Sequence, residues 1–160
     1  MPSTLEFEHF DEKFLEASAR WQQDAEIREL IDAAPFSRQA QLAWYATLPN
    51  RDDYRIWGVS FEGLPVGAVG LKAIGQGAAE YFGYLGDKSC WGKGLGRQLL
   101  DHAESEAQSM GVKVLRLRVL DHNIRAIRLY QKSGYHFCMK PDPNSVMMVK
   151  FLHSNPSPES

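Results

Sequence analysis

The sequence predicts a mixed α/β fold, which some schemes class as α+β, with one central sheet and helices on both of its faces. Two observations support this fold class. Apolar segments typical of strands are interleaved with segments whose apolar residues recur at helical spacing. Their order along the chain is one strand, two helices, a run of strands, and then helix and strand in alternation. We therefore expect six to seven strands and about four helices.

The chain has 160 residues, a length typical of one domain. We assign this domain to residues 1–153, because no linker rich in Pro, Gly or Ser interrupts them. Residues 154–160 are polar and contain prolines, so we expect them to form a disordered tail.

The N-terminal third begins with an alternating strand at residues 5–10. Two helical patterns follow, the first at residues 13–31 and the second at residues 37–48. Ser37 stands at the N-cap of the second helix, where a hydroxyl can accept a hydrogen bond from a free backbone N–H.

Three strands come next, at residues 54–61, 66–74 and 78–86. Residues 62–65 join the first two and contain Gly and Pro, which favours a hairpin.

The C-terminal half alternates helix and strand. A helix at residues 94–110 ends at Gly111, and a strand follows at residues 114–120. One face of this helix is an apolar stripe made of Leu95, Leu99, Leu100, Ala103 and Ala107. The next helix, at residues 123–134, begins with Asn123 as its N-cap and ends at a glycine. Two further strands are expected at residues 135–139 and 146–152.

Composition excludes several functional classes. No apolar run approaches the roughly 20 residues that span a bilayer, and a pI of about 6.2 is not that of a nucleic-acid-binding domain. The N-terminus does not resemble a secretory signal, and two cysteines are too few for a disulfide framework. Neither cysteine has a partner at metal-ligand spacing. We therefore expect a cytoplasmic protein without a metal, and without membrane or nucleic-acid partners.

Charge is distributed unevenly along the chain. Residues 1–53 contain 11 Asp and Glu against 5 Lys and Arg, whereas residues 88–140 contain 10 Lys and Arg against 4 Asp and Glu. The positive half suits a phosphate-bearing ligand, and the negative half suits a cationic one.

A glycine-rich segment opens directly into the helix at residues 94–110. Gly92, Gly94 and Gly96 leave the backbone bare at a helix N-terminus, where unpaired N–H groups attract anions. Lys93 and Arg97 add positive charge. The segment fits neither a dinucleotide fingerprint nor a P-loop, because the required third glycine and the hydroxyl after Gly-Lys are both missing. It nevertheless predicts a pyrophosphate site.

Two motifs together resemble the GNAT superfamily of acetyl-CoA-dependent N-acetyltransferases. They are W-G-K-G-L-G at residues 91–96 and N-I-R-A-I-R-L-Y-Q-K-S-G-Y-H-F at residues 123–137. Trp91 stands where the family loop usually has Arg or Gln, which is similar to the branch of ribosomal-protein alanine acetyltransferases and flagellin nucleotide-sugar amine acetyltransferases. The resemblance covers residues 54–152 well and implies a GNAT-like mixed sheet.

The resemblance also implies which residues bind acetyl-CoA and transfer the acetyl group. A backbone N–H near Leu85, at a bulge where two strands splay, would bind the acetyl carbonyl, and Tyr130 would protonate the leaving sulfur. The loop would bind the coenzyme through Trp91, Gly92, Lys93, Gly94, Gly96 and Arg97. Asn123, outside the loop, would also contact the coenzyme. The amine would attack directly in a ternary complex, without a metal.

The catalytic base is less defined than the acid. Relatives often place Glu two residues before the glycine of this strand, where Tyr81 stands here, with Glu80 one position earlier. Side chains alternate across a strand, so Glu80 points away from the face of Tyr81 unless a bulge redirects it. Glu80 and a relayed water both remain candidates. His102 and His122 have polar neighbours, and we expect them at the surface.

Aromatic and acidic residues precede the second strand, where the family builds its acceptor pocket. Trp21, Trp44 and Tyr45 either bind a cationic amine together with Asp24 and Glu26, or anchor the helices to the sheet. We favour an amino sugar or another small amine as acceptor. A protein N-terminus, and a non-catalytic acyl-CoA-binding module, remain alternatives. The protein is expected to be a monomer or a homodimer.

Overall fold

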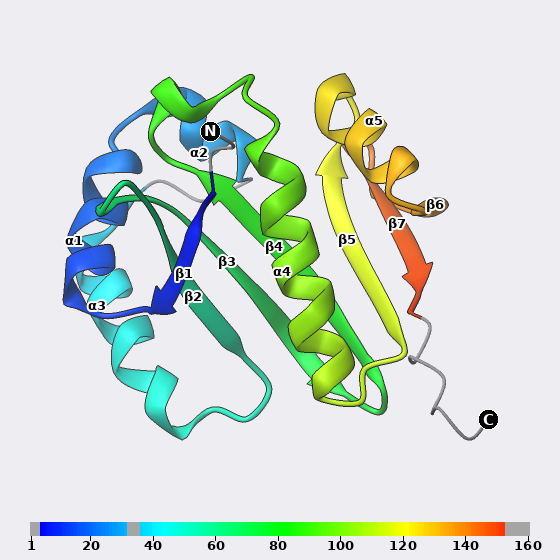
Figure 1. Ribbon diagram of the computed structural model, residues 1–160, viewed down its shortest axis with the longest axis horizontal. Coiled ribbons are helices and arrows are strands. Elements are labelled where there is room, and N and C mark those ends of the chain that lie inside the picture. The colour runs from blue at the N-terminus through cyan, green and yellow to red at the C-terminus, as the bar shows by residue number, and fades with distance from the viewer. Residues whose placement is uncertain (1–3, 32–35, 153–160) are drawn as a thin grey trace.

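The computed structural model of the protein describes residues 4–31 and 36–152, which form a seven-stranded sheet flanked by helices (Figure 1). The expected tail at residues 154–160 lies outside the described residues. The strands are β1 (Glu6–His9), β2 (Arg55–Phe61), β3 (Leu64–Gly75), β4 (Ala78–Leu85), β5 (Val114–Leu120), β6 (His136–Asp142) and β7 (Ser145–Phe151). The helices are α1 (Glu12–Trp21), α2 (Ala25–Leu30), α3 (Arg38–Thr47), α4 (Leu95–Ser109) and α5 (Ile124–Lys132), with short 3-10 turns at Leu48–Asn50 and Lys88–Cys90. The mixed α/β class and the strand number are confirmed.

The sheet has the order β1-β2-β3-β4-β5-β7-β6. All neighbouring strands are antiparallel except β4 and β5, which are parallel. This parallel pair is short, because the pairing runs only from Ala78 with Val114 to Tyr81 with Leu117. Beyond Tyr81 the two strands have no paired residues, so the sheet is split along half the length of β4.

Helices cover both faces, as the sequence predicts. In Figure 1, α4 and α5 lie in front of the sheet and α1, α2 and α3 lie behind it. The larger core forms under α4, whose buried residues match the predicted apolar stripe: Leu95, Leu99, Leu100, Ala103 and Ala107. A smaller core on the other face centres on Phe10, Phe14, Leu15 and Ala68.

The first predicted helix is wrong, because residues 13–31 form two helices instead of one. The chain turns after Trp21, and Asp24 starts α2 by accepting a hydrogen bond from the Glu26 N–H at 2.8 Å. Asp24 is a strong N-cap residue inside a continuous helical pattern, and its position is the sequence signal for the start of a second helix.

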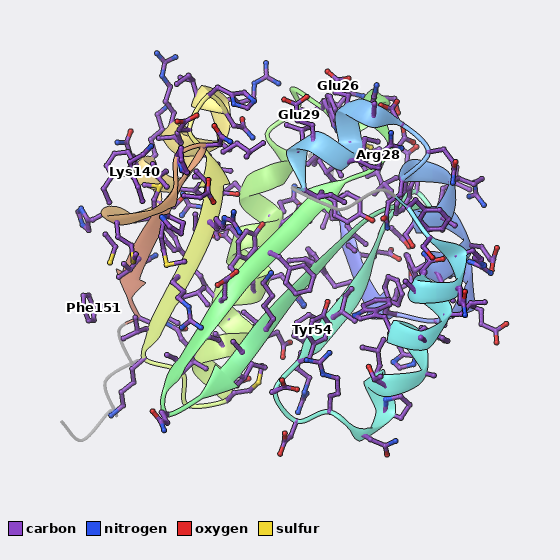
Figure 2. All side chains as sticks on the ribbon, turned by 180° about the vertical axis from the view of Figure 1, so that it is seen from behind. Glu26, Arg28, Glu29, Tyr54, Lys140 and Phe151 are labelled. Carbon is purple, nitrogen blue, oxygen red and sulfur yellow. The ribbon has the colours of Figure 1, made fainter. Side chains whose placement is uncertain are left out.

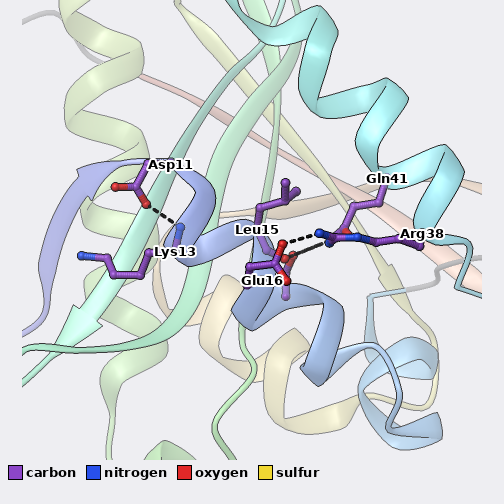
Figure 3. Close-up of polar contacts among 7 residues, drawn as sticks. Asp11, Lys13, Leu15, Glu16, Arg38 and Gln41 are labelled. Atoms are coloured by element: carbon purple, nitrogen blue, oxygen red, sulfur yellow. Dashed lines mark hydrogen bonds and ion pairs between the residues drawn. The ribbon is translucent and has the colours of Figure 1, made fainter.

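Polar contacts attach α3 to α1, since α3 has no fully buried residue. The Gln41 amide donates to the Leu15 carbonyl at 3.2 Å and to the Ser18 hydroxyl at 2.8 Å, and Arg38 pairs with Glu16 (Figure 3). Ser37 caps α3 as predicted, accepting from the Ala40 N–H.

Candidate active site

A cavity of about 800 Å³ lies where β4 and β5 separate. Strands β4 and β5, the loop after β4, and the starts of α4 and α5 line it, together with α2. Nine of the ten predicted site residues line this cavity: Glu80, Leu85, Trp91, Gly92, Gly94, Gly96, Arg97, Asn123 and Tyr130. Lys93, the tenth, is exposed and is not among the lining residues.

The glycine loop has the backbone shape of an anion site. Gly92 and Gly94 have φ angles of 76° and 74°, in the left-handed region that favours glycine. Gly94 is the N-cap of α4 and provides no capping side chain, so the first-turn N–H groups remain available to a ligand. Gly94 has nothing within 4 Å of its Cβ position, so the approach to these groups is open.

Leu85 and Trp91 connect the end of β4 to this loop. The Trp91 indole N–H donates to the Leu85 carbonyl at 2.8 Å. The N–H of the next residue, Gly86, donates to the carbonyl of Val66 on β3 at 2.8 Å. Because backbone groups alternate along a strand, the Leu85 N–H is directed to the opposite edge of β4, where the sheet is split.

Arg97 is engaged within the protein. Its guanidinium pairs with Asp101 at 2.9 Å and donates to the Ser133 hydroxyl at 3.1 Å, which joins the start of α4 to the end of α5. Arg125 was not predicted, yet it lines the cavity, and its Nη1 lies 3.8 Å from the Cβ position of Gly92. Its place two residues after Asn123, at the start of α5, was the available signal.

Tyr130 is packed between two other tyrosines at the inner end of the cavity. Its ring centroid lies 6.2 Å from that of Tyr81 and 6.0 Å from that of Tyr135. Burial raises the pKa of Tyr130 to about 12, so its hydroxyl keeps its proton near neutral pH. Asn123 starts the same helix, accepting from the Ala126 N–H at 3.3 Å, as an N-cap should.

Glu80 and Tyr81 lie on opposite faces of β4. The pairing of β3 with β4 runs without a shift from Lys72–Glu80 to Gly67–Leu85, and the only irregularity falls on the other side of Glu80. No bulge in this pairing therefore redirects Glu80 to the face of Tyr81. Tyr81 is buried under α4, whereas the Glu80 carboxylate lies 3.4 Å from the Lys72 ammonium and 3.5 Å from the Arg116 guanidinium.

The side of the cavity beside α2 is built from residues that the sequence did not single out. The rings of Tyr54 and Phe82 are tilted by 35° with their centroids 5.4 Å apart, and three apolar residues of α2 and its C-cap line the same cavity. The latter are Ile27, Leu30 and Ile31. Figure 2 shows Tyr54 near the middle of the sheet and α2 above it, and no helix covers β5 and β7 in that view.

The aromatic residues considered for acceptor binding serve as anchors instead. Trp44 and Tyr45 pack on Phe10 at 5.7 and 6.3 Å in the smaller core. Trp21 packs edge-on against Tyr84. Trp21, Trp44 and Tyr45 are not among the residues that line the cavity.

Other reactive side chains of the described residues do not form a second centre. Burial raises the pKa of the Cys90 thiol, which keeps it protonated, and Cys138 is exposed. The described residues contain no cluster of three His, Cys, Asp or Glu side chains that could hold a metal ion. Within residues 4–31 and 36–152, no helix has the length and apolarity to cross a membrane. His122 is exposed as expected. The surface position predicted for His102 is wrong, because its Nε2 is buried between Phe7 and Trp57.

The family described as Acetyltransferase (GNAT) family matches residues 17–135. An uncharacterized protein of Methanocaldococcus jannaschii is 26% identical over 106 residues, which are 66% of this chain but only 22% of that protein's length.

Two solved structures have the same fold. The spermidine N-acetyltransferase of Vibrio cholerae, in complex with CoA and spermine, superposes with a TM-score of 0.85 at 17% identity, covering 94% of this chain and 96% of that one. The N-acetyltransferase PseH of Campylobacter jejuni superposes with a TM-score of 0.70 at 17% identity, covering 96% of this chain and 100% of that one.

Proposed function

Because the chain belongs to the acetyltransferase (GNAT) family, we propose that it transfers the acetyl group of acetyl-CoA to a primary amine by direct attack in a ternary complex. The observation that carries this proposal is that one cavity lies at the split of β4 and β5. It brings together the end of β4, the glycine loop and Tyr130, which are far apart in sequence. These three parts are what acetyl transfer requires: a site for the carbonyl, one for the phosphates, and an acid.

In this mechanism the glycine loop binds the coenzyme pyrophosphate through backbone N–H groups. Gly92, Gly94 and Gly96 allow the phosphate oxygens to approach closely, and the helix dipole of α4 adds to the attraction. Arg125 supplies positive charge at the start of the loop. Arg97 instead fixes α5 relative to α4.

The acetyl carbonyl accepts a hydrogen bond from the Leu85 N–H, which stabilises the oxyanion of the tetrahedral intermediate. When this intermediate collapses, the C–S bond breaks, and the Tyr130 hydroxyl donates its proton to the departing thiolate. Because the pKa of Tyr130 is raised to about 12, the phenol is protonated near neutral pH, and the proton released by the attacking amine restores it after each turnover.

The attacking amine must also lose a proton. Glu80 lies on the same face of β4 as Phe82, where we propose that the acceptor binds, but both of its carboxylate oxygens are engaged, one with Lys72 and the other with Arg116. This engagement favours a water molecule as the direct proton acceptor, with Glu80 at most a relay.

The acceptor is proposed to be a small molecule, an amino sugar or another small amine. The support is the shape of the acceptor side, which is a cavity bounded by α2 and by Tyr54 and Phe82. We also propose that acetyl-CoA is the co-substrate and that the protein is cytoplasmic. We place it in the branch of ribosomal-protein alanine acetyltransferases and flagellin nucleotide-sugar amine acetyltransferases.

A panel assay tests the proposal. The protein is incubated with acetyl-CoA and one amine at a time, chosen from amino sugars, their nucleotide-linked forms, spermidine, amino acids and N-terminal peptides, and free thiol is followed. We expect thiol release well above the hydrolysis background with at least one small amine. Release with peptides alone would contradict the small-molecule acceptor, and no release with any amine, although CoA binds, would indicate a binding module.

A further inference from the structure

We propose that the acceptor amine also carries an anionic group, a phosphate or a carboxylate, which binds Lys72 at the floor of the cavity. This inference rests on the proposed function and specifies its substrate class. It reverses the expectation, drawn from the acidic N-terminal third, that the acceptor is recognised through its positive charge.

A row of charged side chains crosses three neighbouring strands. Lys72 on β3 is paired in register with Glu80 on β4, and Glu80 is paired in register with Arg116 on β5. The Glu80 carboxylate therefore lies between two cations, with one oxygen 3.4 Å from the Lys72 ammonium and the other 3.5 Å from the Arg116 guanidinium. One negative charge faces two positive charges, which leaves the row with a net charge of about +1.

Exposure decides which cation is available to a ligand. The Glu80 side chain is 18% exposed and that of Arg116 30%, whereas the Lys72 side chain is 47% exposed. Lys72 and Glu80 line the cavity, but Arg116 is not among its lining residues. Arg116 therefore compensates Glu80 from the β5 side, and the ammonium of Lys72 presents the uncompensated charge to the cavity. It lies 5.9 Å from the ring centroid of Phe82, at the floor of the acceptor side.

Carboxylates that could attract a cationic acceptor are already paired. Among the described residues that line the cavity, the carboxylates are those of Glu26 and Glu80. Glu26 is held by Lys88 at 2.8 Å, and Asp24 beside it is held by the same ammonium at 2.7 Å. A polyamine would have to displace these internal cations, whereas a phosphate or carboxylate meets Lys72 directly.

The test compares ligands that differ in charge and share the same amine. Glucosamine 6-phosphate is paired with glucosamine, and β-alanine with β-alaninamide. Each is titrated calorimetrically into the CoA-saturated protein, and kcat/KM is measured with acetyl-CoA. We expect the anionic member of at least one pair to bind about tenfold more tightly and to have the higher kcat/KM, with the preference falling as salt rises. The pair that responds tells phosphate from carboxylate.

Variants connect the preference to the row of charges. Lys72→Met should remove the preference for the anionic ligand. The double variant Lys72→Met with Arg116→Met leaves Glu80 unpaired and should favour spermidine instead. Lys140→Met is the matched control, because Lys140 also pairs with a carboxylate at 3.4 Å, that of Asp121, but lies outside the cavity lining. It should behave as the wild type.

The outcomes separate this inference from the proposed function. An equal affinity for charged and neutral ligands, or a preference that survives Lys72→Met, would overturn the inference even if amines are acetylated. A charge preference that depends on Lys72, without turnover of any amine, would support the inference and contradict the proposed catalysis.

Discussion

Tyr130, the proposed acid, is held in place by its neighbours. Its ring is packed between Tyr81 and Tyr135, and Tyr135 is fixed in turn by donating to Glu104 at 2.9 Å. Gly134, with a φ of 97°, makes the turn that returns the chain from the end of α5 to Tyr135. The surroundings of Tyr130 are therefore set by local backbone geometry as well as by the core.

Replacing Tyr130 with Phe tests its role as an acid. The variant keeps the ring, so the melting temperature should stay near the wild-type value, while kcat should fall roughly a hundredfold, at the lower end for a general acid. The KM for acetyl-CoA should change little, because the lost interaction forms mainly in the transition state. Tyr45→Phe, outside the cavity, is the control. A normally folded Tyr130→Phe variant with wild-type kcat would make Tyr130 a packing residue.

Gly94 should matter for coenzyme binding because its backbone is bare. In Gly94→Val a side chain would cover the open N–H groups, so calorimetry should show acetyl-CoA binding at least about tenfold more weakly. Gly77→Val is a matched control, because Gly77 has a φ of 76° and nothing within 4 Å of its Cβ position, but lies outside the cavity lining. Both variants strain the backbone equally. Equal losses of affinity in the two would contradict the assignment of the loop.

At the scale of elements, α4 depends on its packing against the first two strands. His102 of α4 stacks on Phe7 of β1 at 4.0 Å and meets Trp57 of β2 edge-on at 4.8 Å. Its Nε2 is buried without a hydrogen-bond partner, and burial lowers the pKa of His102 below the usual 6.5, although Glu106 acts in the opposite direction.

The lowered pKa of His102 predicts an acid-sensitive fold. Between the folded-state pKa and about 6.5, the unfolded chain binds the proton and the folded protein does not. The free energy of unfolding should therefore decrease as the pH falls below about 6.5, measured by denaturant titration. In His102→Phe this part of the pH dependence should disappear, while His122→Gln, at an exposed position, should retain it. An unchanged pH dependence in His102→Phe would show that another group is responsible.

At the scale of the whole molecule, the sequence predicted what is local and left open what depends on strand pairing. The glycine loop, the N-cap Asn123 and the apolar stripe of α4 are each written in a short segment, and all were placed correctly. Alternation along a strand also separated Glu80 from Tyr81, as the structure confirms. These features need only the periodicity of one element.

The acceptor side could not be predicted in this way. Lys72, Glu80 and Arg116 come together only because three strands pair in one register, and Tyr54 meets Phe82 across the sheet. Trp44, which looked equally suitable for a ligand, is placed in the smaller core by the turn at Asp24 and the packing of α3. The pairing register of the strands and the packing of the helices decide whether such a residue lines the cavity or joins the core, and no short segment encodes either.

The most direct test of acetyl transfer follows the acetyl group itself in a single turnover. The protein is mixed with a limiting amount of acetyl-CoA labelled in the acetyl group, with and without the best amine of the panel, and the label is traced. We expect it to remain on coenzyme A when the amine is absent and to pass to the amine, one acetyl group for each thiol released, when it is present. Label on the protein, or thiol released without an acetylated amine, would contradict direct transfer in a ternary complex.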